Sequence, residues 1–250
     1  MGYPLIVFVI SSVFFLMVAR QYLRRRRPYQ LAWALSLATA VGGSLAYVIF
    51  LAADKSELAF RLYYVFGALL TAPLLGLGSI LVISRGEAAK ARARWIVWGV
   101  GILAVVGAIV LLTNPLDHRA LIQLGSSGSS TYAGPGTNPD VYTANSGKAF
   151  VIGLNIFGAL AVFGVALYSA WQLYKRHGSP RLVTANVVIA LGTYIISQAG
   201  GQARTGHGAG LFWLTMTIGW IVLFGGFMLT STVHRESAAP VLTQAPVASA

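Results

Sequence analysis

The chain has 250 residues, of which 56% are hydrophobic and 10% are charged, and its formal net charge is +12. A water-soluble domain usually carries about a quarter charged residues, so this composition excludes an ordinary soluble protein and predicts an integral membrane protein. Because the chain contains no cysteine, disulfides, cysteine-ligated metals and thiol catalysis are excluded as well.

Seven uncharged apolar segments have about the length that an α-helix needs to cross about 30 Å of hydrocarbon, which is about 20 residues. In chain order they cover residues 4–19, 31–53, 62–84, 95–113, 149–174, 182–203 and 211–233. We therefore predict an all-α fold, a polytopic bundle of seven transmembrane helices in the cell membrane. The bundle occupies residues 1–234.

The basic residues predict the orientation of these helices. The first 19 residues carry no charge and are followed by Arg20 and by four arginines at 24–27, which is the reverse of a cleavable signal peptide. With the N-terminus outside, thirteen Lys and Arg fall on the cytoplasmic side and five on the outer side. This matches the positive-inside rule, and it explains the net charge without nucleic acid as a partner. The expected partners are the bilayer, with anionic headgroups near Arg24–Arg27, and a second copy or another protein.

Two segments are not expected to form membrane-spanning helices. The outer loop at 117–148 contains a stretch rich in Gly, Ser, Thr, Asn and Pro, for which mobility is the default. The tail at 235–250 is dominated by Ala, Pro, Val and Ser, so we predict a disordered cytoplasmic tail.

The first three and the last three helices are candidates for a parallel repeat around the fourth helix. Each trio crosses a basic turn with a proline after its first helix, QYLRRRRPYQL in one and QLYKRHGSPRL in the other. This 3+1+3 organisation resembles the sugar-transporting SWEET family and also the opsins. However, the last helix has no lysine for a retinal Schiff base, and the Pro-Gln pair of the SWEET-related families is absent. Neither family is assigned, and covalent retinal is excluded.

The spans carry almost no charge. No Asp, Glu or Lys lies in the middle of any of them, and intramembrane charges usually mark proton relays, voltage sensors and metal sites. We therefore predict no enzyme, no catalytic residue, no cofactor and no metal site. Arg61 is the nearest approach to an intramembrane charge, and its spacing to Glu57 predicts an ion pair at the outer mouth of the bundle.

Neutral polar and aromatic side chains share helix faces that should point into the bundle. Pro73 is expected to kink the third helix and to free a carbonyl group. These faces predict a ligand or solute pocket that contains Tyr64, Thr71, Asn155, Asn186, Thr193, Ser197, Trp213, Thr217 and Trp220. The alternative is a purely structural role, in which the same groups form hydrogen bonds between helices.

Two functions remain open from the sequence. One is a transporter or channel for a small neutral or weakly polar solute, which the kinked third helix, the polar face of the sixth helix and the possible repeat favour narrowly. The other is a binding or sensing module for a lipid, isoprenoid or pigment, acting as the accessory subunit of a partner. The substrate, coupling ion and oligomeric state do not follow from the residues.

Overall fold

The computed structural model describes residues 2–53, 56–119, 121–122, 142, 146–204 and 209–236. At 201–204, 209–210 and 231–236 it describes the backbone alone. Its helices are α1 (Gly2–Arg25), α2 (Pro28–Ala52), α3 (Glu57–Tyr63), the π-helix η1 (Tyr64–Leu70), α4 (Thr71–Ile83), α5 (Glu87–Thr113), α7 (Ser146–Lys175), α8 (Pro180–Arg204) and α9 (Ala209–Glu236). Since α3, η1 and α4 run on as one helix, seven helices are long and apolar enough to cross a membrane. The predicted all-α bundle, with seven helices that could each span a membrane, is confirmed for the described residues. The predicted tail and most of the outer loop lie outside the described residues.

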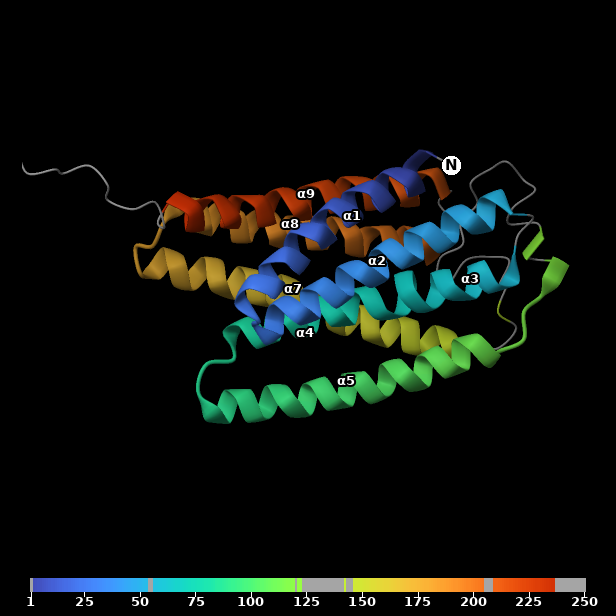
Figure 1. Cartoon of the computed structure of the whole chain (residues 1–250), viewed down its shortest axis with the longest axis horizontal. Helices are drawn as coiled ribbons and strands as arrows, with labels where there is room; N and C mark the ends of the chain where they lie inside the picture. The colour runs from blue at the N-terminus through green and yellow to red at the C-terminus, as the bar shows by residue number, and fades with distance from the viewer. Residues whose placement is uncertain are drawn as a thin grey trace, which may run out of the picture.

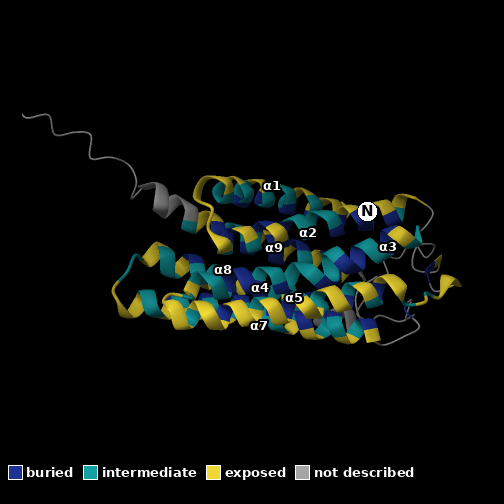
Figure 2. Cartoon of the chain, turned by 60° about the horizontal axis from the view of Figure 1, so that its bottom comes forward, coloured by how far each residue is buried: buried dark blue, intermediate teal, exposed yellow. Residues whose placement is uncertain are grey.

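Figure 1 shows the helix bundle from the side. The contacts between helices join six of the seven into a closed ring. The order around the ring is α1, α2, α3–α4, α7, α8 and α9, and α9 returns to α1. The seventh helix, α5, packs outside the ring against α4, η1 and α7. Its outer face remains exposed along its length (Figure 2), with Trp95 78% and Val105 61% exposed. Large apolar side chains that face outward in this way suit contact with lipid tails.

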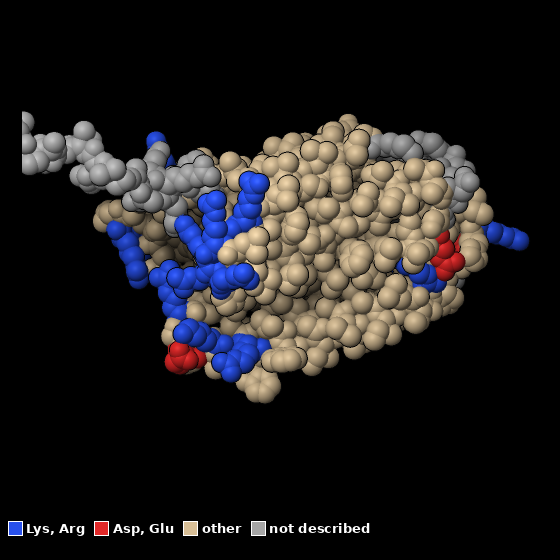
Figure 3. All heavy atoms as spheres, in the orientation of Figure 1, with Lys and Arg blue, Asp and Glu red and all other residues tan. Residues whose placement is uncertain are grey.

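The basic residues gather at one end of the ring (Figure 3), which we call the basic end. The turns there join α1 to α2, α4 to α5 and α7 to α8. Arg26 and His177 have a φ of 50°, and Gly86 has a φ of 87°. Glycine adopts this left-handed backbone without strain, and single left-handed residues commonly end helices. The turns are therefore sharp, and the two helices that each turn joins run antiparallel.

Glycines allow the helices to approach closely. A Cβ added at Gly76 of α4 would lie 2.9 Å from the Cα of Gly158 in α7, and one added at Gly192 of α8 would lie 2.8 Å from the Cα of Leu223 in α9. Membrane helices associate largely through close van der Waals packing, which small residues permit. The ring is therefore tight along α4–α7 and α8–α9, and any cavity must lie between these contacts.

Candidate functional site

The third membrane-spanning helix departs from α-helical geometry at its centre. Residues Tyr64–Leu70 form a π-helix, which ends three residues before Pro73. A proline inside a helix removes one N–H group, and its ring clashes with the carbonyl four residues earlier. The expected disturbance by Pro73 is therefore present as a widened turn, and such π segments occur frequently at functional sites.

Side chains from three helices hold this widened segment. The hydroxyl of Thr71 donates to the Phe66 carbonyl at 2.9 Å, and the hydroxyl of Ser36 in α2 donates to the Thr71 carbonyl at 2.6 Å. Asn155 in α7 donates to the Ala68 carbonyl at 2.5 Å and to its own helix at the Val151 carbonyl at 2.7 Å. The π-helix is thus tied to the helices on either side of it in the ring.

A cavity of about 310 Å³ lies beside the π-helix inside the ring. It occupies the half of the bundle that is remote from the basic end, and every ring helix contributes to its wall, whereas α5 does not. Most lining side chains are apolar. The polar lining groups are Ser44, Tyr63, Thr71, Asn155, Thr193, Ser197, Trp213 and Trp220. Among the residues whose side chains the structure describes, no Asp, Glu, Lys, Arg or His lines the cavity.

A cluster of aromatic side chains closes the end of the cavity that is remote from the basic end. Neighbouring ring centroids in this cluster lie 4.8 to 6.5 Å apart, within the range in which aromatic pairs attract each other. We call the cluster the aromatic cap; its members are Tyr47, Phe50, Phe60, Tyr63, Tyr64, Tyr142, Phe212 and Trp213, all at most 6% exposed. Tyr142, which precedes α7, places its ring on Phe60 and Tyr64, and burial raises the pKa of its phenol.

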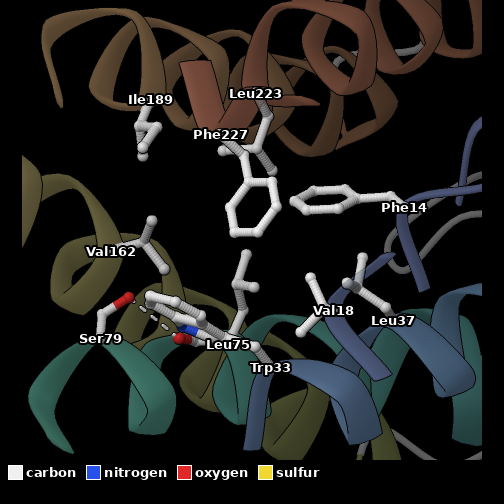
Figure 4. Close-up of a pocket in the computed structure, with 10 residues that line it drawn as sticks. All are labelled: Phe14, Val18, Trp33, Leu37, Leu75, Ser79, Val162, Ile189, Leu223 and Phe227. Atoms are coloured by element: carbon white, nitrogen blue, oxygen red, sulfur yellow. Dashed lines mark hydrogen bonds between the residues drawn. The ribbon is translucent and has the colours of Figure 1, made fainter. Parts of the chain in front are cut away.

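A second, smaller void of about 50 Å³ lies towards the basic end (Figure 4). Leu75, Val162 and Leu223 line both the void and the large cavity, so the two are neighbours along the bundle axis. Phe14 and Phe227 line the void and point towards each other, with their rings in contact at a centroid distance of 4.8 Å. These rings, together with Trp33 and Phe224, form what we call the aromatic plug. Packed apolar side chains thus lie at both ends of the large cavity.

The large cavity reaches the side of the bundle between α7 and α8. Among its lining residues, only Ile156 of α7 and Ser197 of α8 are classed as exposed, and Ile156 is 51% exposed. The two helices meet at the short basic turn and diverge towards the other end (Figure 1). The wall of the cavity is therefore exposed at Ile156 and Ser197, on a side that a bilayer would cover, and we call this place the lateral opening.

Six of the nine pocket residues expected from the sequence line this cavity: Thr71, Asn155, Thr193, Ser197, Trp213 and Trp220. The other three do not line it. Tyr64 lies in the aromatic cap, Asn186 donates to the Leu182 carbonyl at 2.8 Å nearer the basic end, and buried Thr217 donates to the Trp213 carbonyl at 2.7 Å. Helix-face reasoning missed Tyr63 and Ser44. The π-helix explains the first of these, because its longer turn shifts the residues that share a face.

The expected pair of Glu57 and Arg61 lies beside α5, away from the cavity wall. The Arg61 guanidinium contacts the Glu57 carboxylate at 2.7 Å, and it donates to the Leu111 and Leu112 carbonyls at 2.9 and 2.8 Å. These carbonyls belong to the last turn of α5, where a helix carries a partial negative charge. The pair therefore caps α5 and fixes it to α3.

The described residues contain no group of three or more His, Asp or Glu side chains placed to hold a metal ion. No protein-family model, curated protein or solved structure matches the chain. What the cavity can bind therefore follows from its own geometry and chemistry.

Proposed function

We propose that the protein is a membrane-embedded binding protein for a small, uncharged and mainly apolar molecule that reaches its site from the lipid. The observation that carries this proposal is the lateral opening of a neutral cavity whose two ends are closed by aromatic side chains. Of the two functions open from the sequence, this geometry favours the binding module for a lipid, isoprenoid or pigment.

The lining chemistry supports an uncharged ligand. A charge at this depth would require a compensating partner, because charges inside a bilayer are costly. The polar groups that the described lining residues offer are hydroxyl, amide, phenol and indole groups. Apolar walls with a few placed polar groups are typical of small-molecule sites. The apolar part of the ligand would contact leucine, isoleucine, valine and tryptophan side chains.

The volume limits the part of the ligand that fits inside. A water molecule takes about 30 Å³ in the liquid, so 310 Å³ equals the space of roughly ten waters. An organic heavy atom fills a similar or slightly smaller space, which allows roughly ten to fifteen heavy atoms. A longer chain would extend through the lateral opening into the lipid.

Solute transport is the second candidate function. It is supported by the two cavities in series, which the side chains of Leu75, Val162 and Leu223 separate. The order of the ring is compatible with the 3+1+3 repeat, since contact of α1 with α9 would correspond to contact of α7 with α4. In this candidate, the aromatic plug would have to open for solute to leave at the basic end.

The orientation and the partners complete the proposal. With the positive-inside rule, the basic end faces the cytoplasm, the N-terminus lies outside and the membrane is the cell membrane. The arginines at 24–27 would then contact anionic headgroups. A protein partner would convert ligand binding into an output, and a second copy of the chain remains a candidate for that role.

The test compares, in detergent, a variant that places a side chain in the cavity with a control variant on an exposed helix face. Gly200 lines the cavity, Gly153 lies exposed on α7, and a Cβ added at either meets no atom within 4 Å. We expect Gly200→Leu to fill the cavity and abolish retention of a co-purified apolar ligand in native mass spectrometry, whereas Gly153→Leu retains it. Equal retention by both variants would refute binding in this cavity, and vesicle flux without any retained ligand would favour transport.

A further inference from the structure

We infer that the ligand of the large cavity is an alcohol, which donates its hydroxyl hydrogen to the side-chain oxygen of Asn155. This inference rests on the proposed function, because it names the chemical class of the molecule that the cavity binds. It follows from a count of the hydrogen-bond donors on the wall that are already engaged within the protein.

The amide of Asn155 presents an acceptor to the cavity. Both of its N–H groups are engaged, one with the Ala68 carbonyl at 2.5 Å and the other with the Val151 carbonyl at 2.7 Å. Its Oδ1 receives no donor from the described residues, and it is absent from the fully buried unpartnered atoms. Since Asn155 lines the cavity, this oxygen is open to a bound molecule.

The bonds to the π-helix fix the position of this oxygen. The amide plane is held between a carbonyl of the widened segment and a carbonyl of α7, so rotation of the side chain would break both hydrogen bonds. A flipped amide would also place two N–H groups away from these carbonyls. The two backbone carbonyls therefore hold the amide nitrogen of Asn155 away from the cavity and leave its oxygen facing the cavity.

The hydroxyl groups on the wall have also used their hydrogens. Thr71 donates to the Phe66 carbonyl, Ser44 to the Ala40 carbonyl, Thr193 to the Ile189 carbonyl and Ser197 to the Thr193 carbonyl, at distances of 2.8 to 2.9 Å. A hydroxyl has one donor hydrogen and two acceptor lone pairs. Towards the cavity, these four groups therefore act as acceptors.

The remaining donors on the wall are aromatic. They are the phenol of Tyr63, which belongs to the aromatic cap, and the indole of Trp220. The indole of Trp213 is already engaged, because it donates to the Tyr47 hydroxyl. A ketone or aldehyde would need these groups, whereas a hydroxyl group can donate to Asn155 beside the π-helix. A buried acceptor that meets a ligand without a donor remains unsatisfied, and sites of this type discriminate strongly against such a ligand.

Entry from the lipid makes the class more specific. The opening between Ile156 and Ser197 faces the hydrocarbon region, so the molecule must partition into lipid. An alcohol with an apolar body of roughly ten to fifteen carbons, such as a short isoprenoid alcohol, combines that property with the size of the cavity. Its apolar part would contact Val162, Leu223 and the aromatic plug.

The experiment compares three probes of nearly equal size on the delipidated full chain. They are farnesol, its methyl ether and the hydrocarbon farnesene, and binding is measured by the ligand-induced rise in melting temperature and by titration of tryptophan fluorescence. We expect farnesol to bind at least tenfold more tightly than the ether, which keeps the oxygen but has no donor hydrogen. Equal affinity for farnesol and the ether would overturn the inference and leave the proposed function standing.

A variant links the preference to Asn155. Asn155→Leu should bring the affinity for farnesol down to that for the ether, while Leu160→Ala, on the exposed face of the same helix, should leave the preference intact. The comparison of probes on the unchanged protein needs no variant, so it decides the matter even if Asn155→Leu fails to fold. Failure of all three probes to bind would overturn the proposed function together with the inference.

Discussion

Replacement of Gly158 by alanine tests the close contact of α4 and α7 that forms one wall of the cavity. An added Cβ would lie 2.8 Å from the nitrogen of Pro73 and closer still to the carbonyl group of Ala72. Ordinary contact begins at 3.4 Å, so the helices must separate by at least 0.6 Å, the difference of the two distances. A gap of this size already forfeits a quarter or more of the dispersion energy across the contact.

We expect Gly158→Ala to lower the free energy of unfolding by about 1–3 kcal/mol, as overpacking usually does. Gly153→Ala is the matched control on the same helix, since its Cβ meets no atom within 4 Å. That control should gain up to about 1 kcal/mol from the better helix propensity of alanine. Both changes in the free energy of unfolding would be measured by reversible unfolding in mixed micelles. Equal stability of the two variants would refute the close approach of α4 to α7 at Gly158.

Four further outcomes follow from the structure. Arg61→Leu should lower the free energy of unfolding by about 1.5–3 kcal/mol, because α5 loses charge-assisted bonds to its last turn, and a loss no larger than that of Lys90→Leu would contradict this role. Tyr142→Phe should keep or slightly raise stability, since the buried phenol oxygen has no partner among the described residues, whereas Tyr142→Ala should cost about 3–5 kcal/mol in a thermal melt. Ile156→Trp should slow ligand association about tenfold in stopped-flow fluorescence by narrowing the lateral opening, and Leu160→Trp should not. In this cysteine-free chain, a membrane-impermeant maleimide should label Ser146→Cys in intact cells and Ala88→Cys only after permeabilisation, and the reverse pattern would contradict the proposed orientation.

The number and approximate position of the helices could be predicted from the sequence because each helix depends on a single continuous stretch of apolar residues. An uncharged apolar run of about 20 residues has few alternatives to a membrane-spanning helix. The exact ends were less predictable: α1 begins at Gly2 and continues to Arg25, since the arginines of a last turn favour the helix C-terminus. A search for uncharged segments cannot find helix ends that carry charged residues.

The residues of the cavity wall could be predicted only in part. Thr193 and Ser197 of α8 share the helix face that 100° per residue predicts, and both line the cavity, whereas Asn186 of the same predicted face does not. The sequence predicts Tyr64 in the cavity wall, whereas the structure places Tyr63 there. The π-helix begins at Tyr64, and no propensity in the sequence gives the length of such a segment. The lateral opening and the two aromatic clusters depend on the order of the ring, which adjacent spans alone do not specify.

The interpretation of Arg61 also depended on a long-range contact. Its spacing to Glu57 predicts the pair, but the two α5 carbonyls that it caps lie 50 and 51 residues further along the chain. An arginine that is already bound by one carboxylate and two carbonyls has little capacity left for an external anion. This contact therefore gives Arg61 a structural role between α3 and α5.

The decisive measurement is native mass spectrometry of the protein after gentle extraction with its own lipids. We expect one neutral, apolar molecule per chain, which persists in Gly153→Leu and disappears in Gly200→Leu. A chain that carries no such molecule in its unaltered form, or one whose bound molecule is unaffected by Gly200→Leu, would contradict a ligand site in this cavity.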